Sequence, residues 1–274
     1  MVDLFSAVVL GIIQGLTEFI PISSTAHLRI ASAFLNIEDP GAAYSAVIQL
    51  GTLVSLLIYF REDLWQVARA GLEGLFSGEP FKDQDARMVW YLVLGTIPVS
   101  VFGLLLSDYI KGPFRSLHVS AGSLIVLGIV LWVVDRTSTK NREIDSLTWK
   151  DALWIGLGQA LALIPGSSRS GTTLTVGLLR GFDRYAAMRF SFLLSIPAIA
   201  LSGVYELIKD FHELESAGLT GLFVGTLTAA VVGYATVAGL LHYLRKNTTL
   251  PFVLYRIGMG VLLYILLYAG IIEP

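Results

Sequence analysis

The chain has 274 residues, of which 54% are hydrophobic and only 15% are charged, whereas a typical soluble domain has roughly 25% charged residues. This composition predicts an all-α polytopic membrane protein and excludes a large soluble domain. The formal net charge of −2 gives no reason to expect nucleic acid as a partner, and the absence of cysteine excludes thiol catalysis, disulfides and Cys-bound metals.

The first predicted element is an interrupted apolar segment at about 11–25, GIIQGLTEFIPISST. The residues before it include Asp3 and no basic side chain, so we expect no cleaved signal peptide. Pro21 breaks a helix, and the hydroxyls from Ser23 to Thr25 suit the N-cap of a second half-helix. Broken helices at membrane depth line cavities, which predicts a re-entrant hairpin here.

Three nearly uncharged runs follow, a second interrupted segment comes at about 156–173, and three more runs complete the chain. A helix needs roughly 17–25 apolar residues to cross a bilayer. We therefore expect six membrane spans and two hairpins in one membrane domain covering residues 1–274. The six runs are 44–60, 88–106, 119–134, 190–208, 217–241 and 252–271.

The two interrupted segments resemble each other, which divides the chain into two repeats at about 1–135 and 150–274. In the third run of each half, LGTIP at 94–98 also resembles VGTLT at 224–228. Chance similarity between apolar helices is the alternative to a true repeat. The matches between the segments are Gly11 with Gly156, Gln14 with Gln159 and, after one deleted residue, Pro21-x-Ser-Ser with Pro165-x-Ser-Ser.

The charge of the loops indicates the topology, because cytoplasmic loops are enriched in Lys and Arg. If both interrupted segments are re-entrant, the four loops with most of the basic residues share one side of the membrane. If all eight segments cross once, the basic residues divide almost evenly. The re-entrant topology therefore predicts inverted repeats, with both termini outside the cytoplasm. The four basic loops are 61–87, 135–151, 180–189 and 243–251.

The first interrupted segment holds candidate catalytic groups. Glu18 is an ionisable residue in an apolar run, which is a functional hypothesis by default, although a structural ion pair is the alternative. Its carboxylate and the Gln14 carbonyl oxygen, four residues earlier on the same helix face, would suit Mg²⁺ or Ca²⁺. His27 is a candidate general acid or base, with a packing role as its alternative. The hydroxyls between Glu18 and His27 are those of Ser23, Ser24 and Thr25.

The second interrupted segment holds candidate anion-binding groups in the stretch GSSRSGT at 166–172. Successive backbone N–H groups at a helix N-terminus bind anions, and the planar guanidinium of Arg169 matches phosphate oxygens. Pairing of Arg169 with an acid is the alternative. The predicted substrate-binding residues are Gly166, Ser168, Arg169, Ser170 and Thr172 here, with Ser23 and Thr25 in the first segment.

Together the two segments supply the groups that phosphoryl chemistry requires. A metal ion and Arg169 would neutralise charge on the phosphoryl group, and a serine hydroxyl could attack it while His27 handles the proton. A lipid transporter or flippase that holds a phosphate headgroup without cleaving it is the alternative function. A carrier needs no nucleophile and no proton shuttle, so the residues favour an enzyme. The sequence contains neither the P-loop pattern GxxxxGK[ST] nor HExxH.

The motifs GLTEFIPISSTAH at 15–27 and PGSSRSGTT at 165–173 together resemble the two signatures of the bacitracin-resistance family of undecaprenyl-diphosphate phosphatases. The resemblance covers the whole chain in length, span number and motif spacing. It implies a plasma-membrane hydrolase that converts undecaprenyl diphosphate to the monophosphate and inorganic phosphate, recycling the lipid carrier of cell-wall synthesis. It also implies inverted repeats with re-entrant helices and a site open to the periplasmic side.

The same resemblance implies roles for individual residues. Gln14 stands where the family often has Glu, so one metal ion, or a weaker metal site, is expected. Ala26 stands where Gly is common, and neither change removes a required group. The implied roles are Ser24 as nucleophile, His27 as acid/base or phosphate stabiliser, Glu18 and Gln14 at the metal, and Arg169 on the pyrophosphate beside Ser168 and Ser170.

Glycine-rich faces in the second half are expected to pack helices within one chain, with a homodimer as the alternative. The glycines are Gly225, Gly233 and Gly239.

Overall fold

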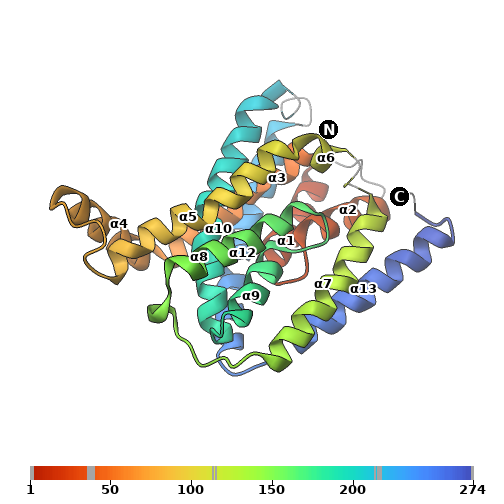
Figure 1. Ribbon diagram of the computed structural model, residues 1–274. Helices are drawn as coiled ribbons and strands as arrows, with labels where there is room; N and C mark the ends of the chain where they lie inside the picture. The colour runs from red at the N-terminus through yellow and green to blue at the C-terminus, as the bar shows by residue number, and fades with distance from the viewer. Residues whose placement is uncertain are drawn as a thin grey trace.

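The computed structural model describes residues 3–35, 41–112, 114, 116–212, 214 and 218–272, and regular structure in them is helical apart from one isolated β-bridge (Figure 1). The first half contains α1 (Leu4–Thr17), α2 (Ser24–Leu35), α3 (Gly41–Tyr59), α4 (Arg61–Phe76), α5 (Gln84–Leu105), α6 (Ser107–Lys111) and α7 (Leu117–Thr137). The second half contains η2 (Ile144–Ser146), α8 (Trp149–Ala160), η3 (Leu161–Leu163), α9 (Arg169–Leu179), α10 (Arg184–Lys209), α12 (Leu219–Leu244) and α13 (Leu250–Tyr268).

Within the described residues, five helices are long and apolar enough to cross a membrane, namely α5, α7, α10, α12 and α13. A sixth candidate is α3 together with α4, which are bent relative to each other by 78°. Each apolar run expected from the sequence falls largely within one of these helices, which confirms the predicted multi-pass all-α class. The bend after α3 was not expected.

The chain is broken at the two places that the sequence predicts. In the first half α1 ends at Thr17 and α2 begins at Ser24; in the second half α8 and η3 are followed by α9, which begins at Arg169. The residues directly before α2 and α9 are Ser23, with φ 76°, and Ser168, with φ 69°. A left-handed backbone at a residue other than glycine costs about 1–3 kcal/mol and is concentrated at functional sites.

Each break turns the chain back on itself, because α2 packs against α1 and α9 packs against α8. Ser23 and Ser168, the two left-handed serines, lie as far apart in the sequence as Gly11 and Gly156 do. The matched glutamines have the same separation. The backbones therefore correspond without the deletion that the sequence alignment required. In this register Ser24 corresponds to Arg169, so one break presents a hydroxyl where the other presents a guanidinium.

Close glycine contacts hold α1 and α8 against helices of the opposite half. A methyl group on Gly11 would overlap the carbonyl oxygen of Gly225 in α12, and one on Gly156 would overlap that of Gly95 in α5. Gly95 and Gly225 are the glycines of the matched LGTIP and VGTLT stretches. The first helix of each half thus packs, backbone to backbone, on the third run of the other half.

The glycine-rich face of α12 packs mostly within the chain, as expected. Gly225 lies against Ala7 and Tyr44, and a methyl group on Gly233 would lie 2.6 Å from the Ser55 hydroxyl oxygen. Gly239 has no atom within 4 Å of the position that a methyl group would occupy.

A buried carboxylate fixes the base of the second hairpin. Asp151 in the first turn of α8 accepts hydrogen bonds from Arg142 (3.1 and 2.8 Å), Arg180 (2.8 Å) and the Thr148 hydroxyl (2.7 Å). Burial alone would raise the pKa of the Asp151 carboxyl, but the hydrogen bonds from Arg142, Thr148 and Arg180 hold it well below its ordinary value. The two arginines therefore tie the loop before α8 to the C-terminal end of α9.

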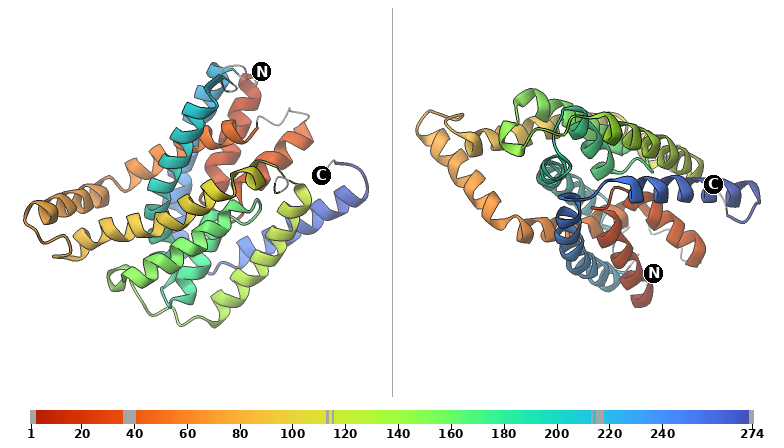
Figure 2. Two further views of the ribbon diagram at one scale, coloured as in Figure 1. Left: turned by 45° about the horizontal axis from the view of Figure 1, so that its top comes forward. Right: turned by 90° about the horizontal axis from the view of Figure 1, so that it is seen from below.

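One part of the chain projects from the bundle. Helix α4 and the N-terminal end of α5 form an arm, and the chain ends lie on the side of the molecule away from it (Figure 2). Asp63 near the start of α4 pairs with Arg189 in α10, with 2.7 Å between the carboxylate and guanidinium atoms, which anchors the base of this arm.

Candidate active site

The two breaks meet through an ion pair between Glu18 and Arg169. Arg169, at the start of α9, donates from Nη2 to Oε1 of Glu18, just after α1. Only 4% of the Glu18 side chain and 16% of the Arg169 side chain are exposed. The two tips therefore meet, as the sequence predicts, and their contact joins the two halves of the chain. It is also the ion pair that the sequence left open as the alternative for Glu18 and for Arg169.

The second oxygen of Glu18 receives two more hydrogen bonds from its own half. Gln14 donates from Nε2 to Glu18 Oε2 at 2.9 Å, and Ser24 donates from Oγ to the same oxygen at 2.6 Å. The Gln14 bond follows from the helical geometry of α1, which places side chains four residues apart on one face. The Ser24 bond follows from the break, because the turn at Ser23 brings the start of α2 beside the end of α1.

A fourth helix contributes to the cluster through Gln49 of α3. Its Oε1 accepts a hydrogen bond of 3.1 Å from Arg169 Nη2, the same nitrogen that contacts Glu18. Gln49 was not predicted as a site residue, although an amide inside the apolar run 44–60 was a signal that could have identified it.

His27 is held on both ring nitrogens. Nδ1 lies 2.7 Å from the carbonyl oxygen of Ser23, and Nε2 lies 2.7 Å from the hydroxyl of Tyr255 in α13, whose ring stacks on the imidazole with centroids 5.5 Å apart. Because a carbonyl can only accept, Nδ1 carries the hydrogen in this arrangement. In the neutral ring Nε2 is then the acceptor, and the Tyr255 hydroxyl donates to it.

The second tip has the polar N-terminus that the sequence predicts. Ser168 caps α9 by accepting a hydrogen bond of 3.2 Å from the backbone N–H of Gly171, and its hydroxyl lies 3.2 Å from that of Ser170. The Ser170 hydroxyl also donates to the carbonyl of Ile20 in the first break, at 3.4 Å. Gly166 has φ 88°, and a methyl group there would overlap the backbone of Ser120, so only glycine fits this turn.

A second arginine, Arg256 of α13, joins the breaks through their backbones. It is fully buried and donates to the carbonyl oxygens of Pro21 (3.3 Å), Gly166 (3.2 Å) and Ser167 (3.0 Å), as well as to two carbonyls of α7. Carbonyl dipoles therefore surround the guanidinium. Arg256 was missed as a site residue, although an ionisable group inside the run 252–271 carried the same signal as Glu18.

Three predicted site residues differ from the prediction in their exposure or their contacts. Thr25 is exposed, and the Thr172 hydroxyl donates to the carbonyl of Arg169 in its own helix at 3.1 Å. Ser24 directs its hydroxyl hydrogen to Glu18, whereas the sequence interpretation paired it with His27.

The residues at the first break fit a single hard divalent cation. In proteins Mg²⁺ is usually held by one or two carboxylates, with substrate phosphates and water completing its shell. Glu18 supplies one carboxylate, and Gln14 Oε1 is buried with no hydrogen-bond partner among the described residues. Within the part of the chain that the structure describes, no three His, Cys, Asp or Glu side chains gather as a metal site. A cation here would therefore depend on phosphate oxygens for part of its coordination.

Comparisons with known proteins agree with the two motifs. The family model "Bacitracin resistance protein BacA" matches residues 7–262. Over 273 residues the chain is 53% identical to an undecaprenyl-diphosphatase of Myxococcus xanthus, covering 99% of this chain and 92% of that protein. Undecaprenyl-diphosphatases of Chloroherpeton thalassium (50% over 280 residues, 99% of each chain) and Thermobifida fusca (47% over 272 residues, 99% and 93%) are also similar. The chain therefore belongs to the BacA family of bacitracin-resistance proteins, as its sequence motifs predicted.

Proposed function

We propose that this chain is an undecaprenyl-diphosphate phosphatase, a membrane hydrolase that converts undecaprenyl diphosphate to undecaprenyl phosphate and inorganic phosphate. The proposal is carried by one observation: Glu18 accepts both the hydroxyl of Ser24 and the guanidinium of Arg169. The two breaks thus bring together a candidate nucleophile (Ser24), a candidate base (Glu18) and a guanidinium that can bind phosphate (Arg169). The relatives named above carry the same activity in their names.

In the proposed reaction Ser24 Oγ attacks the terminal phosphorus. An O–P bond to Ser24 forms, the phosphoanhydride P–O bond breaks, and undecaprenyl phosphate leaves. The proton of Ser24 passes to Glu18 Oε2, which lies 2.6 Å away. Water then attacks the phosphoserine: an O–P bond to water forms and the Ser24 Oγ–P bond breaks. The water oxygen and its protons remain on inorganic phosphate, and Ser24 Oγ takes back its proton from Glu18.

The remaining groups bind and orient the pyrophosphate. Arg169 and the backbone N–H groups at the start of α9 would bind its oxygens, so substrate would compete with Glu18 for the guanidinium. His27, held by Ser23 and Tyr255, would stabilise the terminal phosphate or move its proton. A cation held by Glu18 and Gln14 would neutralise phosphate charge. The hydroxyls that would line the site are those of Ser23, Thr25, Ser168, Ser170 and Thr172, with Gly166 shaping the turn.

The two halves are proposed to be inverted repeats with both hairpins re-entrant. This is supported by the matching left-handed Ser23 and Ser168 and by the reciprocal glycine contacts between α1 and α12 and between α8 and α5. With the basic loops in the cytoplasm, the site opens to the periplasmic side and both termini lie outside.

Phosphate release separates this enzyme from a lipid carrier with the same architecture. The purified protein in detergent is expected to release phosphate from undecaprenyl diphosphate with Mg²⁺ or Ca²⁺, and release should fall when a chelator is added. A protein that binds the lipid but releases no phosphate with either cation would contradict the hydrolase and favour the carrier. Among variants, a Ser24→Ala protein that kept most of its activity would assign the attack to water or to His27 instead.

A further inference from the structure

Helix α4 leaves the membrane-crossing part of the molecule at a sharp angle. Its axis is bent by 78° from that of α3. The 19 residues of α3 rise by roughly 28 Å at 1.5 Å per residue, close to the ~30 Å thickness of the hydrocarbon core. Helix α3 can therefore span on its own, and α4 is not needed to complete the crossing.

One face of α4 is already packed against the protein. A methyl group on Gly71 would lie 2.6 Å from a side-chain carbon of Val89 in α5, and one on Gly74 would lie 2.9 Å from the carbonyl oxygen of Glu79. Leu64 at the start of the helix packs against the main hydrophobic core. This inner face, with the Asp63–Arg189 ion pair, fixes the orientation of the helix.

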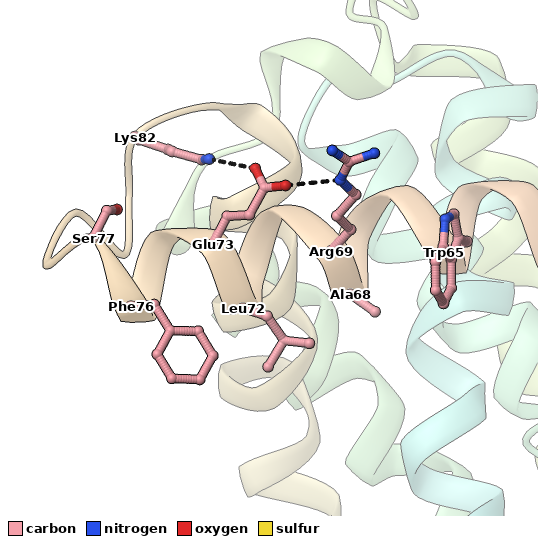
Figure 3. Close-up of a pocket in the computed structure, with 8 residues that line it drawn as sticks. All are labelled: Trp65, Ala68, Arg69, Leu72, Glu73, Phe76, Ser77 and Lys82. Atoms are coloured by element: carbon pink, nitrogen blue, oxygen red, sulfur yellow. Dashed lines mark hydrogen bonds and ion pairs between the residues drawn. The ribbon is translucent and has the colours of Figure 1, made fainter.

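A second apolar face of α4 has no partner among the residues that the structure describes. We call the residues Trp65, Ala68, Leu72 and Phe76 the outer stripe; they lie three or four residues apart and so share one side of the helix. Trp65 is 71% exposed, Leu72 is 56% exposed and Phe76 is 90% exposed. Figure 3 shows these side chains directed to the same side of α4.

The charged side chains of the arm line one pocket with the outer stripe but point to the other side of α4, where they pair with each other. Arg69 Nε lies 2.7 Å from one carboxylate oxygen of Glu73, and Lys82 Nζ lies 3.0 Å from the other (Figure 3). These ion pairs hold the pKa of the Glu73 carboxyl below its ordinary value. Helix α4 therefore has a charged face and a separate, bare apolar face.

We propose that α4 lies in the boundary between the lipid headgroups and the acyl chains, with the outer stripe inserted among the lipids. A helix with a strongly charged face, low overall hydrophobicity and aromatic residues on its other face is suited to that position. Just before the bend, the end of α3 exposes Leu57 and Ile58. An exposed apolar surface of α3 therefore directly precedes the outer stripe in the chain. Trp65 is of the residue type that concentrates at membrane interfaces.

The occupant is a lipid surface and not a second copy of the chain. The four side chains of the outer stripe are far fewer than the roughly 20–30 residues that each partner contributes to a stable protein interface. Between residues 61 and 87 acidic residues outnumber basic ones, so attraction to anionic lipids does not drive the contact. Apolar insertion should therefore be the same in zwitterionic and in anionic bilayers. The proposal depends on the membrane location of the chain and not on its proposed hydrolase activity.

The absence of natural cysteine makes single-cysteine variants directly usable. A nitroxide is attached to Leu72→Cys, Phe76→Cys or Ala68→Cys in the outer stripe, and to Glu62→Cys or Gln66→Cys on the charged face as matched controls on the same helix. Each variant of the full chain is placed in phosphatidylcholine nanodiscs, with and without phosphatidylglycerol. Collision of the label with oxygen, which partitions into lipid, is compared with collision with a water-soluble nickel chelate.

The three outer-stripe labels are expected to collide more with oxygen and less with the nickel chelate, and the two control labels to show the reverse, in both lipid mixtures. Outer-stripe labels as accessible to nickel as the controls would overturn the proposal, because α4 would then lie in water. Outer-stripe labels that neither reagent reaches, with spin–spin broadening between copies, would also overturn it and assign the stripe to a second copy of the chain.

Discussion

At the scale of single residues, the state of Glu18 depends on partners from three segments. Its carboxylate contacts Gln14, Ser24 and Arg169 in a place where only 4% of the side chain is exposed. An exposed ion pair contributes little, but removal of one member of a buried pair leaves an uncompensated charge. Glu18 and Arg169 should therefore behave as one functional unit.

Tyr255 is predicted to act through His27. Tyr255→Phe removes the hydroxyl that contacts Nε2 but keeps the stacked ring, so kcat/KM should fall about tenfold, the equivalent of one hydrogen bond of roughly 1.4 kcal/mol. Steady-state phosphate release measures the effect. In a His27→Ala background the same substitution should cause no further loss, because the two side chains act together. An equal loss in both backgrounds would show that Tyr255 does not work through His27.

The sequence allowed part of the cluster to be predicted. Glu18 and Arg169 were found because ionisable groups are costly inside apolar runs. Arg256 was not predicted, because no polar motif lies beside it in the sequence. Gln49 was not predicted, because it is uncharged and so gives a weaker signal inside an apolar run. Tyr255 could not be distinguished from the other tyrosines of the apolar runs, because its role depends on a contact with His27, which is far away in the sequence.

At the scale of helices, glycine decides which helices touch. The contacts of Gly11 with Gly225 and of Gly156 with Gly95 leave no room for a side chain. The breaks between helices were predictable from Pro21 and Pro165 and from the serines that follow. The 78° bend after α3 was not, because neither proline nor glycine marks it; contacts far apart in the sequence, such as Asp63 with Arg189, hold α4 in place.

Gly156→Ala is predicted to destabilise the fold. The added methyl group would overlap the Gly95 carbonyl oxygen, and such overpacking costs about 1–3 kcal/mol beyond the gain in helix propensity. The thermal midpoint in detergent should therefore fall by several degrees. Gly239→Ala is the matched control, since no atom lies within 4 Å of its new methyl group, and its midpoint should stay or rise. Equal midpoints for the two variants would contradict the packing described.

At the scale of the whole molecule, the six apolar runs were sufficient to predict a multi-pass helical protein. The loop charges predict its orientation in the membrane. The alignment of the two halves needed a gap at the sequence level, whereas the matched Ser23 and Ser168 remove it. An alignment compares residue types, and serine rarely has a positive φ. The left-handed backbone at Ser23 and Ser168 could therefore not be predicted from the sequence.

The proposed orientation predicts which loops an impermeant thiol reagent reaches from outside the cell. Glu79→Cys, in the loop between α4 and α5, should resist labelling in intact cells and react after permeabilisation. Asp108→Cys in α6 is the matched control, because it also replaces an exposed acidic residue. It should react in intact cells. The opposite pattern would reverse the orientation, and labelling of both positions from outside would contradict the topology.

The central claim is that the two breaks form one phosphatase site, and phosphate release from undecaprenyl diphosphate by matched variants tests it most directly. Glu18→Gln and Arg169→Ala, one from each break, should each lower kcat/KM by at least ~10²-fold. The kcat/KM of the double variant should be no lower than that of the less active single variant. Glu62→Gln and Arg61→Ala, from an exposed ion pair, are the controls and should keep full activity. If either single variant at the breaks kept most of its activity, or if the two losses multiplied, the breaks would not form one site.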